Sequence, residues 1–424
     1  MSSIKTGWGE DPTPRYDALA RPFRPLFDEI RAGAIERELE RILPGTEVRR
    51  LAEAGLTALR VPEEYGGGGA SLPELFGVLA ELGEADSNLV QSIRAHLGFV
   101  EVVLNSPRKA WREKWLRRIA DGALIGPGRG ETGEVRQGAL DTRLSQRDGK
   151  WYLDGTKFYS TGLYYADWAD VGTTGDDGKS YAVLVSARSE GVDIKDDWNG
   201  FGQRLTSSGT TVYKNVVVDA DEIRLDEEKF PYSQAFFQLV HLATLTGIGR
   251  AASSETAAAV RGRARSFSNG NAARVKHDPQ ILEIVGRIRS AAYTSGAIVQ
   301  LTARALERVW QAARTGDAAA VEDARAIADL EIAQSQSIVI DLILKASSEI
   351  FDALGASSTL ASNGLDRFWR NARTLATHNP RVFKDRIAGD FAVNGVPAPG
   401  QWKIGVVQGL SLIHISEPTR RYAI

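Results

Sequence analysis

The residue best suited to acid–base chemistry is His378, which lies in the segment LDRFWRNARTLATHNPR. Imidazole has the side-chain pKa nearest to neutrality, whereas the amide of the adjacent Asn379 takes no proton at pH 7. The other histidines before residue 410 are scattered, at His96, His241 and His277, with no HExxH or similar pair. Because the chain also has no cysteine, disulfides, thiolate catalysis and a zinc or di-iron centre are not expected. We therefore predict no metal site.

Two other segments hold groups that could bind a ring or a phosphate. The run GPGRGET, residues 126–132, contains three glycines whose backbone N–H groups a flat ring or a phosphate could approach, although a lone glycine loop is most often only a turn. Arg265, in the run RARSF, has the planar fork that suits a phosphate. It could equally belong to a solvated face of the helix on which we expect it.

Composition excludes several classes of protein. The chain has 424 residues, of which 43% are hydrophobic and 25% are charged, as in ordinary globular proteins of two or three domains. A net charge of −2 does not indicate a nucleic-acid or membrane-surface partner. No window has the run of about 18 apolar residues that a spanning helix needs, and the start of the chain has no apolar signal-peptide core. We therefore predict a cytoplasmic location.

The elements that must position these residues form three blocks. Apolar residues recur at helical spacing over residues 1–122, where Ser71 before Pro73 and Glu74 is typical of a helix start. Residues 123–229 change to short alternating runs separated by DG turns, which predicts a compact antiparallel β domain, and residues 230–409 return to long helices, notably over 280–314 and 318–354. Residues 410–424 begin with LSLIHISEPTR, which looks like a translated sequencing adapter. We expect a non-native tail there rather than a natural polar one, and no role for its histidine.

Several motifs in this order resemble the acyl-CoA dehydrogenase family. They are VPEEYGGGGAS at residues 61–71, DGTKFYSTG at 154–162, and LDRFWRNART at 365–374. The combination of Asp196-Asp197-Trp198, Ser208-Gly209, His378 and the ending Asn394-Gly395 is most similar to the family's FMN-dependent monooxygenase branch. That branch contains dibenzothiophene and dimethylsulfone-pathway monooxygenases and amine N-hydroxylases. The resemblance implies an α+β fold with an N-terminal α-helical domain, a central antiparallel β-barrel domain and a C-terminal four-helix bundle, assembled as a homotetramer.

The resemblance also implies a reaction. Reduced FMN from a separate flavin reductase would react with O2 to give a C4a-hydroperoxyflavin, which would oxygenate a small organosulfur, amine or aromatic substrate. The chain has no dinucleotide fingerprint of its own, which is consistent with an external reductase. FAD is less expected than FMN, because the Phe-Gly pair that follows the arginine in FAD-binding members is absent after Arg265.

Carried over to this chain, the family pattern gives a set of candidate site residues. Thr161 would contact the flavin edge, and Ser160 would point to the opposite face of the same strand unless a bulge re-aims it. The catalytic group would be His378, Thr161 and His96, and Trp198 with His96 would line the substrate pocket. The cofactor group would be Pro127, Gly128, Arg129, Gly130, Glu131, Thr132, Lys157, Tyr159, Ser160, Thr161, Arg265, Ala356, Ser357 and His378. The chain departs from the family pattern at Ala95, Pro127 and Ser357.

Two other functions stay open at this point. An acyl-CoA dehydrogenase with FAD would need a base, but Asn379 stands nine residues after Arg370, where dehydrogenases have a glutamate. Other members of the family have the base on the helix after the β domain, but residues 231–254 of this chain hold no Asp or Glu. A non-catalytic flavoprotein of the same fold is the second alternative.

Overall fold

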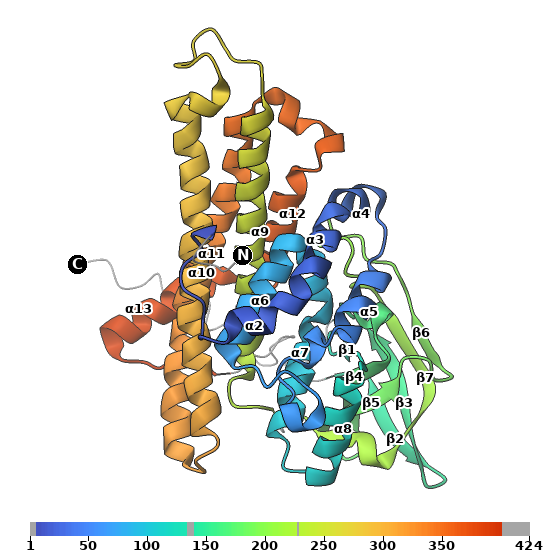
Figure 1. The fold of residues 1–424 in the computed structure, drawn as a ribbon. Coiled ribbons are helices and arrows are strands. Elements are labelled where there is room, and N and C mark those ends of the chain that lie inside the picture. The colour runs from blue at the N-terminus through green and yellow to red at the C-terminus, as the bar shows by residue number, and fades with distance from the viewer. Residues whose placement is uncertain (1–5, 134–139, 227–228, 401–424) are drawn as a thin grey trace, which may run out of the picture.

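The computed structural model describes residues 6–133, 140–226 and 229–400. The predicted non-native tail at 410–424 lies outside these residues. Figure 1 shows a sheet on one side of the molecule, three long helices on the other, and the N-terminal helices between them. The order of α block, β block and α block is that expected from the sequence, and the α+β fold class is confirmed.

The N-terminal block is helical, as predicted. Its α6 begins after Ser71, whose hydroxyl accepts from the Glu74 backbone N–H while the Glu74 carboxylate accepts from the Ser71 N–H, a complete capping box. The helices of this block are α2 (Tyr16–Ala20), α3 (Arg24–Ala32), α4 (Ala34–Glu40), α5 (Gly45–Glu53), α6 (Leu72–Ala85), α7 (Ser87–Asn105) and α8 (Lys109–Ala120).

The central sheet is mixed rather than purely antiparallel. Its hydrogen-bonded order is β6-β7-β3-β2-β4-β5-β8, and β1 also pairs with β4. The pairs β1–β4 and β2–β4 are parallel, which the prediction missed, because long connections along the chain return each strand in the same direction. The ladder ends at β6 and β8 in the described residues, so hydrogen bonds do not close the predicted barrel. The strands are β1 (Ile125–Gly128), β2 (Arg143–Arg147), β3 (Lys150–Lys157), β4 (Trp168–Gly175), β5 (Ser180–Ser186), β6 (Val192–Ile194), β7 (Thr211–Val218) and β8 (Ile223–Leu225).

The C-terminal block is built on three long helices. Two of them match the predicted segments closely: 279–312 against an expected 280–314, and 318–354 as expected. The first long helix is apolar on nearly all sides and packs against both its neighbours in the bundle and the N-terminal helices; Phe236 on it meets Phe76 edge to face at 5.4 Å. The helices are α9 (Ser233–Gly262), α10 (Pro279–Ala312), α11 (Ala318–Leu354), α12 (Asp366–Thr377) and α13 (Lys384–Asn394).

Candidate functional site

The glycine loop that follows β1 packs directly on the turn that follows β3. The Phe158 N–H donates to the Gly130 carbonyl at 3.0 Å. A Cβ at Gly130 would lie 2.5 Å from the Phe158 carbonyl oxygen, and one at Gly126 would lie 2.5 Å from the Leu163 Cα. Glycine is therefore required for this close approach of two backbones. Two predicted cofactor segments, 127–132 and 157–161, are thus brought together.

We expected Thr161 on a strand, but it lies in a turn, because β3 ends at Lys157. Tyr159 has a φ of 63° and Gly162 a φ of 78°, which reverse the chain. The Ser160 N–H donates to the Gly209 carbonyl at 3.1 Å, and the Thr161 hydroxyl is 2.9 Å from that of Ser208. Strand alternation therefore does not apply, although the two side chains do differ: Thr161 is half-buried, and the Ser160 hydroxyl is buried without a partner in the described residues.

Two aromatic side chains lie beside this turn. The Tyr159 ring is 55% exposed, and its centroid is 6.2 Å from that of Trp198. The Trp198 indole N–H donates to the Gln203 carbonyl at 3.1 Å, which fixes the ring. The exposed Tyr159 ring and the half-buried Thr161 hydroxyl therefore lie on the same turn, and the buried Ser208 hydroxyl lies behind Thr161.

Several predicted cofactor residues bind other protein groups instead. The buried Lys157 ammonium is 2.5 Å from a Glu131 carboxylate oxygen, which also accepts from the Thr142 hydroxyl at 2.7 Å. Arg129 pairs with Asp170 at 2.6 Å and with Asp226. We therefore assign these three side chains to shaping the loop rather than to contacting a cofactor; the nearby Thr132 is exposed, and Pro127 pairs with β4 as part of β1.

His96 has both ring nitrogens occupied. Nε2–H donates to the Thr57 carbonyl at 3.0 Å, and Nδ1 accepts from the Ile125 N–H at 3.2 Å. The side chain is 1% exposed, and burial lowers its pKa to about 4. This geometry leaves no free nitrogen for a reacting atom, so we reassign His96 from catalysis to anchoring the start of β1.

His378 caps the end of α12 and faces two other basic side chains. Its Nε2 lies 3.1 Å from an Arg94 guanidinium nitrogen, and its ring centroid is 4.4 Å from that of His241 on α9. Because arginine only donates, Nε2 must be the unprotonated nitrogen. The side chain is solvent-accessible, yet the protein around the ring desolvates it, and together with the Arg94 charge this lowers its pKa to about 3. His378 is therefore neutral at pH 7. Its pKa lies well below the value near neutrality that we predicted from the sequence.

Asn379, which the resemblance places where dehydrogenases have their base, has its side-chain amide bound to that of a glutamine. Its Nδ2 donates to the Gln238 Oε1 at 2.6 Å, and the Gln336 Nε2 donates to the same oxygen at 3.0 Å. The first carboxylate on α9, Glu255, pairs with Arg367. Neither position that acyl-CoA dehydrogenases use for a base therefore holds one.

Arg265, Ala356 and Ser357 lie apart from these groups. Arg265 is exposed in the loop beyond Gly262, where α9 ends, and not on the helix as predicted. The same loop reaches residues 354–357, because Arg263 binds the Leu354 carbonyl. The 12 residues of α12, about 18 Å of helix, then separate that region from His378. Within one chain, the residues predicted to bind the phosphate therefore do not lie beside the predicted catalytic residue His378.

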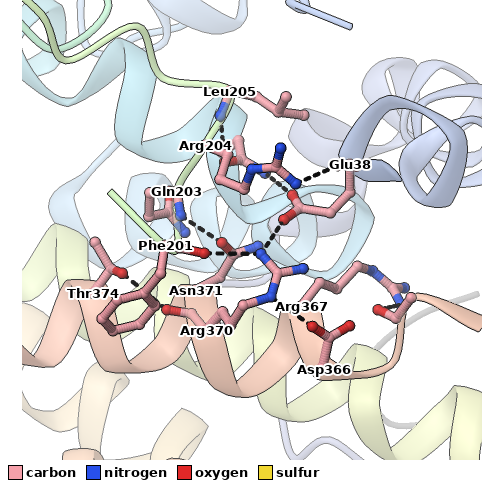
Figure 2. A network of polar contacts seen from close by, with 12 residues as sticks. Glu38, Phe201, Gln203, Arg204, Leu205, Asp366, Arg367, Arg370, Asn371 and Thr374 are labelled. Carbon is pink, nitrogen blue, oxygen red and sulfur yellow. Dashed lines mark hydrogen bonds and ion pairs between the residues drawn. The ribbon is translucent and has the colours of Figure 1, made fainter. Parts of the chain in front are cut away.

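Arg370 and Asn371 on α12 hold the segment 201–203, which follows Trp198 in the chain (Figure 2). Arg370 donates to the Glu38 carboxylate at 2.8 Å and to the Phe201 carbonyl at 2.9 Å, and Asn371 accepts from the Gln203 N–H at 2.5 Å. A small cavity lies beside the N-terminal half of α12, lined in part by Glu38, Arg367 and Asn371. It belongs to this network and not to the His378 cluster.

Sequence reasoning missed Arg94, His241 and Gln238. Gln238 and His241 are one helical turn apart in the otherwise apolar run AFFQLVHLATL, and a polar pair on one face of a buried helix is a usable signal. Arg94 carries no such signal, because its role depends on a partner 284 positions away.

Comparison with known proteins gives the family. Residues 17–123 match the acyl-CoA dehydrogenase N-terminal domain and residues 239–381 its C-terminal domain, together more than half of the chain. A dibenzothiophene monooxygenase of Rhodococcus qingshengii is 29% identical over 89% of this chain and 94% of its own length. A probable FMNH2-dependent monooxygenase, SfnC, of Pseudomonas putida is 28% identical over 91% and 98%.

Solved structures agree with this result. The methanesulfinate monooxygenase MsuC of Pseudomonas fluorescens superposes with a TM-score of 0.82 at 26% identity, over 90% of this chain and 98% of its own. The matched domains, the order of the three blocks and the similarity along nearly the whole chain lead to one conclusion: this protein belongs to the acyl-CoA dehydrogenase family.

Proposed function

We propose that this protein is a flavin monooxygenase, which takes reduced FMN from a separate reductase and uses O2 to oxygenate a small organosulfur compound. The observation that carries the proposal is Asn379, an amide bound to Gln238 where a dehydrogenase has its base. Similarity to dibenzothiophene and FMNH2-dependent monooxygenases supports both the reaction and the cofactor. Amines and aromatic compounds are the alternative substrate classes.

The turn at residues 158–162 fits the ring of a flavin. The half-buried Thr161 hydroxyl, held by that of Ser208, offers a hydrogen bond at a ring edge. The buried Ser160 hydroxyl has no described partner, and Tyr159 with Trp198 offers an aromatic face. When bound, reduced FMN would supply the electrons that activate O2 and allow one oxygen atom to pass to the substrate.

The chain's own residues would position the reactants. Thr161 would orient the ring edge, and the Lys157–Glu131 pair would hold the loop beside it. With a pKa of about 3, His378 is a neutral imidazole at pH 7 and does not act as an imidazolium acid, so its proposed role is to accept from Arg94 and hold that side chain. Exclusion of water and fixed geometry are thus the protein's contribution.

Isotope labelling tests the proposal. Purified protein is mixed with a flavin reductase, NADH, FMN and an organosulfur compound under 18O2, and the product should gain one labelled oxygen atom. A Thr161→Val variant, which keeps the shape but loses the hydroxyl, should lower turnover at least tenfold, and Thr161→Ser should retain most of it. Anaerobic reduction of bound flavin by an acyl-CoA would instead show a dehydrogenase. Flavin binding without either reaction would show a non-catalytic flavoprotein.

We also propose that the bundle mediates a homotetramer. The long helices α10 and α11 expose apolar side chains, among them Tyr293 (47%), Leu301 (58%) and Ile338 (52%), which other copies of the chain would cover. Light scattering of the purified protein should give four times the monomer mass. No helix in the described residues is long and apolar enough to cross a membrane. Dependence on a reductase and NADH supports a cytoplasmic location.

A further inference from the structure

Arg94 on α7 carries a charge that no described acidic group compensates. Two fully buried arginines elsewhere in the chain pair with carboxylates: Arg37 with Asp86, and Arg60 with Glu101. Among the described residues, the half-buried Arg94 has only the neutral His378 at 3.1 Å and the ring of Phe237, 5.1 Å from the guanidinium carbon. Burial lowers the pKa of Arg94 to about 10, so it stays protonated at neutral pH. An uncompensated charge of this kind is costly, which indicates a missing anionic partner.

The groups around Arg94 are neutral and suited to binding. His241 is 3% exposed, and its Nε2 is buried without a described partner beside the His378 ring. Burial, together with the nearby His378 and Arg94, holds the pKa of His241 well below its usual range. Next along the chain from His378, the Asn379 amide binds Gln238, and the Gln336 Oε1 is also buried, with no partner among the residues that the structure describes. Among the described residues, the cluster therefore has one positively charged guanidinium, two buried polar atoms without a hydrogen-bond partner, and no negative charge.

The direction in which Arg94 points separates it from the proposed flavin contacts. Ser92 and His96, one helical turn apart on α7, meet Gly162 and Ile125 of the β block. Arg94 lies between them in sequence but contacts α9 and the end of α12. Its anionic partner would therefore lie on the bundle side of α7, which fits a substrate better than the phosphate of FMN.

We propose that the substrate is an organic sulfinate, R–SO2⁻, whose two oxygens accept a bidentate pair of hydrogen bonds from Arg94. The inference rests on the proposed monooxygenase function and names its substrate class. The balanced reaction is R–SO2⁻ + FMNH2 + O2 giving R–SO3⁻ + FMN + H2O. Sulfur loses two electrons and gains one oxygen atom, FMNH2 loses two electrons and two protons, and the second oxygen atom leaves as water. A neutral sulfide or sulfone would leave Arg94 uncompensated.

Binding measurements on the FMN-saturated protein test the inference directly. Methanesulfinate is titrated into the wild type, with dimethyl sulfone as the neutral analogue and acetate as a different small anion. Methanesulfinate should bind at least tenfold more tightly than dimethyl sulfone. Arg94→Gln should abolish this preference, and Arg94→Lys, which keeps the charge without the fork, should retain part of it. Arg31→Gln, at an exposed arginine on α3, is the matched control and should bind like the wild type.

A second measurement separates binding from folding. The NMR titration of His378 should shift to higher pH when methanesulfinate neutralises Arg94. FMN affinity should be the same in Arg94→Gln as in the wild type, and the thermal midpoint of the variant should be no lower, because the variant loses an uncompensated charge. Equal affinity of the wild type for methanesulfinate and dimethyl sulfone would overturn the inference. So would tighter binding of acetate, or loss of FMN binding in Arg94→Gln, which would assign Arg94 to the flavin.

The two proposals can fail separately. Labelled oxygen in the product from a neutral sulfide, without sulfinate binding, would refute the sulfinate site and leave the monooxygenase standing. Sulfinate binding without any oxygenation under reduced FMN and O2 would refute the monooxygenase.

Discussion

The contact between the Thr161 turn and α7 predicts a large effect of Gly162→Ala. An added Cβ would lie 1.9 Å from the Ser92 carbonyl oxygen, so the turn or the helix must move by about 1.5 Å to restore an ordinary contact of 3.4 Å. The φ of 78° adds a left-handed cost of about 1–2 kcal/mol for any L-residue, and the forced shift adds about 1–3 kcal/mol. Because Thr161 moves with the turn, turnover should fall on the order of 100-fold.

Gly178→Ala is the matched control for this prediction. Gly178 has nearly the same φ, 76°, but a Cβ there would meet no atom of the described residues within 4 Å. Gly178→Ala should therefore lower the free energy of unfolding only by the cost of a left-handed φ, about 1–2 kcal/mol, and leave FMN affinity and turnover unchanged. The assays are the urea midpoint by circular dichroism, FMN affinity by flavin fluorescence, and product formation with the reductase. Equal urea midpoints and equal turnover for the two variants would refute the reasoning, because the turn would then not be tightly seated on α7.

Two further predictions concern stability. With a native pKa of about 4, His96 stays neutral while the unfolded chain takes up a proton below about pH 6.5, so its contribution is complete above that pH and is lost as pH falls toward 4. Between pH 7.5 and 5 the unfolding free energy of the wild type should therefore fall about 2 kcal/mol more than that of His96→Gln in urea titrations; parallel losses would contradict the assignment of a neutral, buried His96. Arg370→Met should cost about 3–5 kcal/mol, because Glu38, 1% exposed, loses its cation. Arg21→Ala, at an exposed pair with Asp17, should change stability by less than about 1 kcal/mol, and similar thermal midpoints for the two variants would argue against a tight Arg370–Glu38 pair.

Local patterns in the sequence predicted several helices of the fold correctly. Helical periodicity gave α11 with the right ends, and the Ser71–Glu74 spacing gave the start of α6, because both depend on residues within a few positions of one another. The parallel pairing of β1 with β4 could not be predicted in the same way, since pairing partners are chosen by the packing of distant segments.

The sequence by itself disfavoured one reaction. At the two positions where the resemblance places a dehydrogenase base, Asn379 and the acid-free start of α9 supply no carboxylate, and residue identity is enough to say so. Only the tertiary structure decided what the remaining groups do. It placed Thr161 in a turn beside Ser208, occupied both nitrogens of His96, and set Arg94 against His378 across 284 positions. A side chain's charge state and partners depend on its surroundings, and those surroundings exist only once the chain has folded.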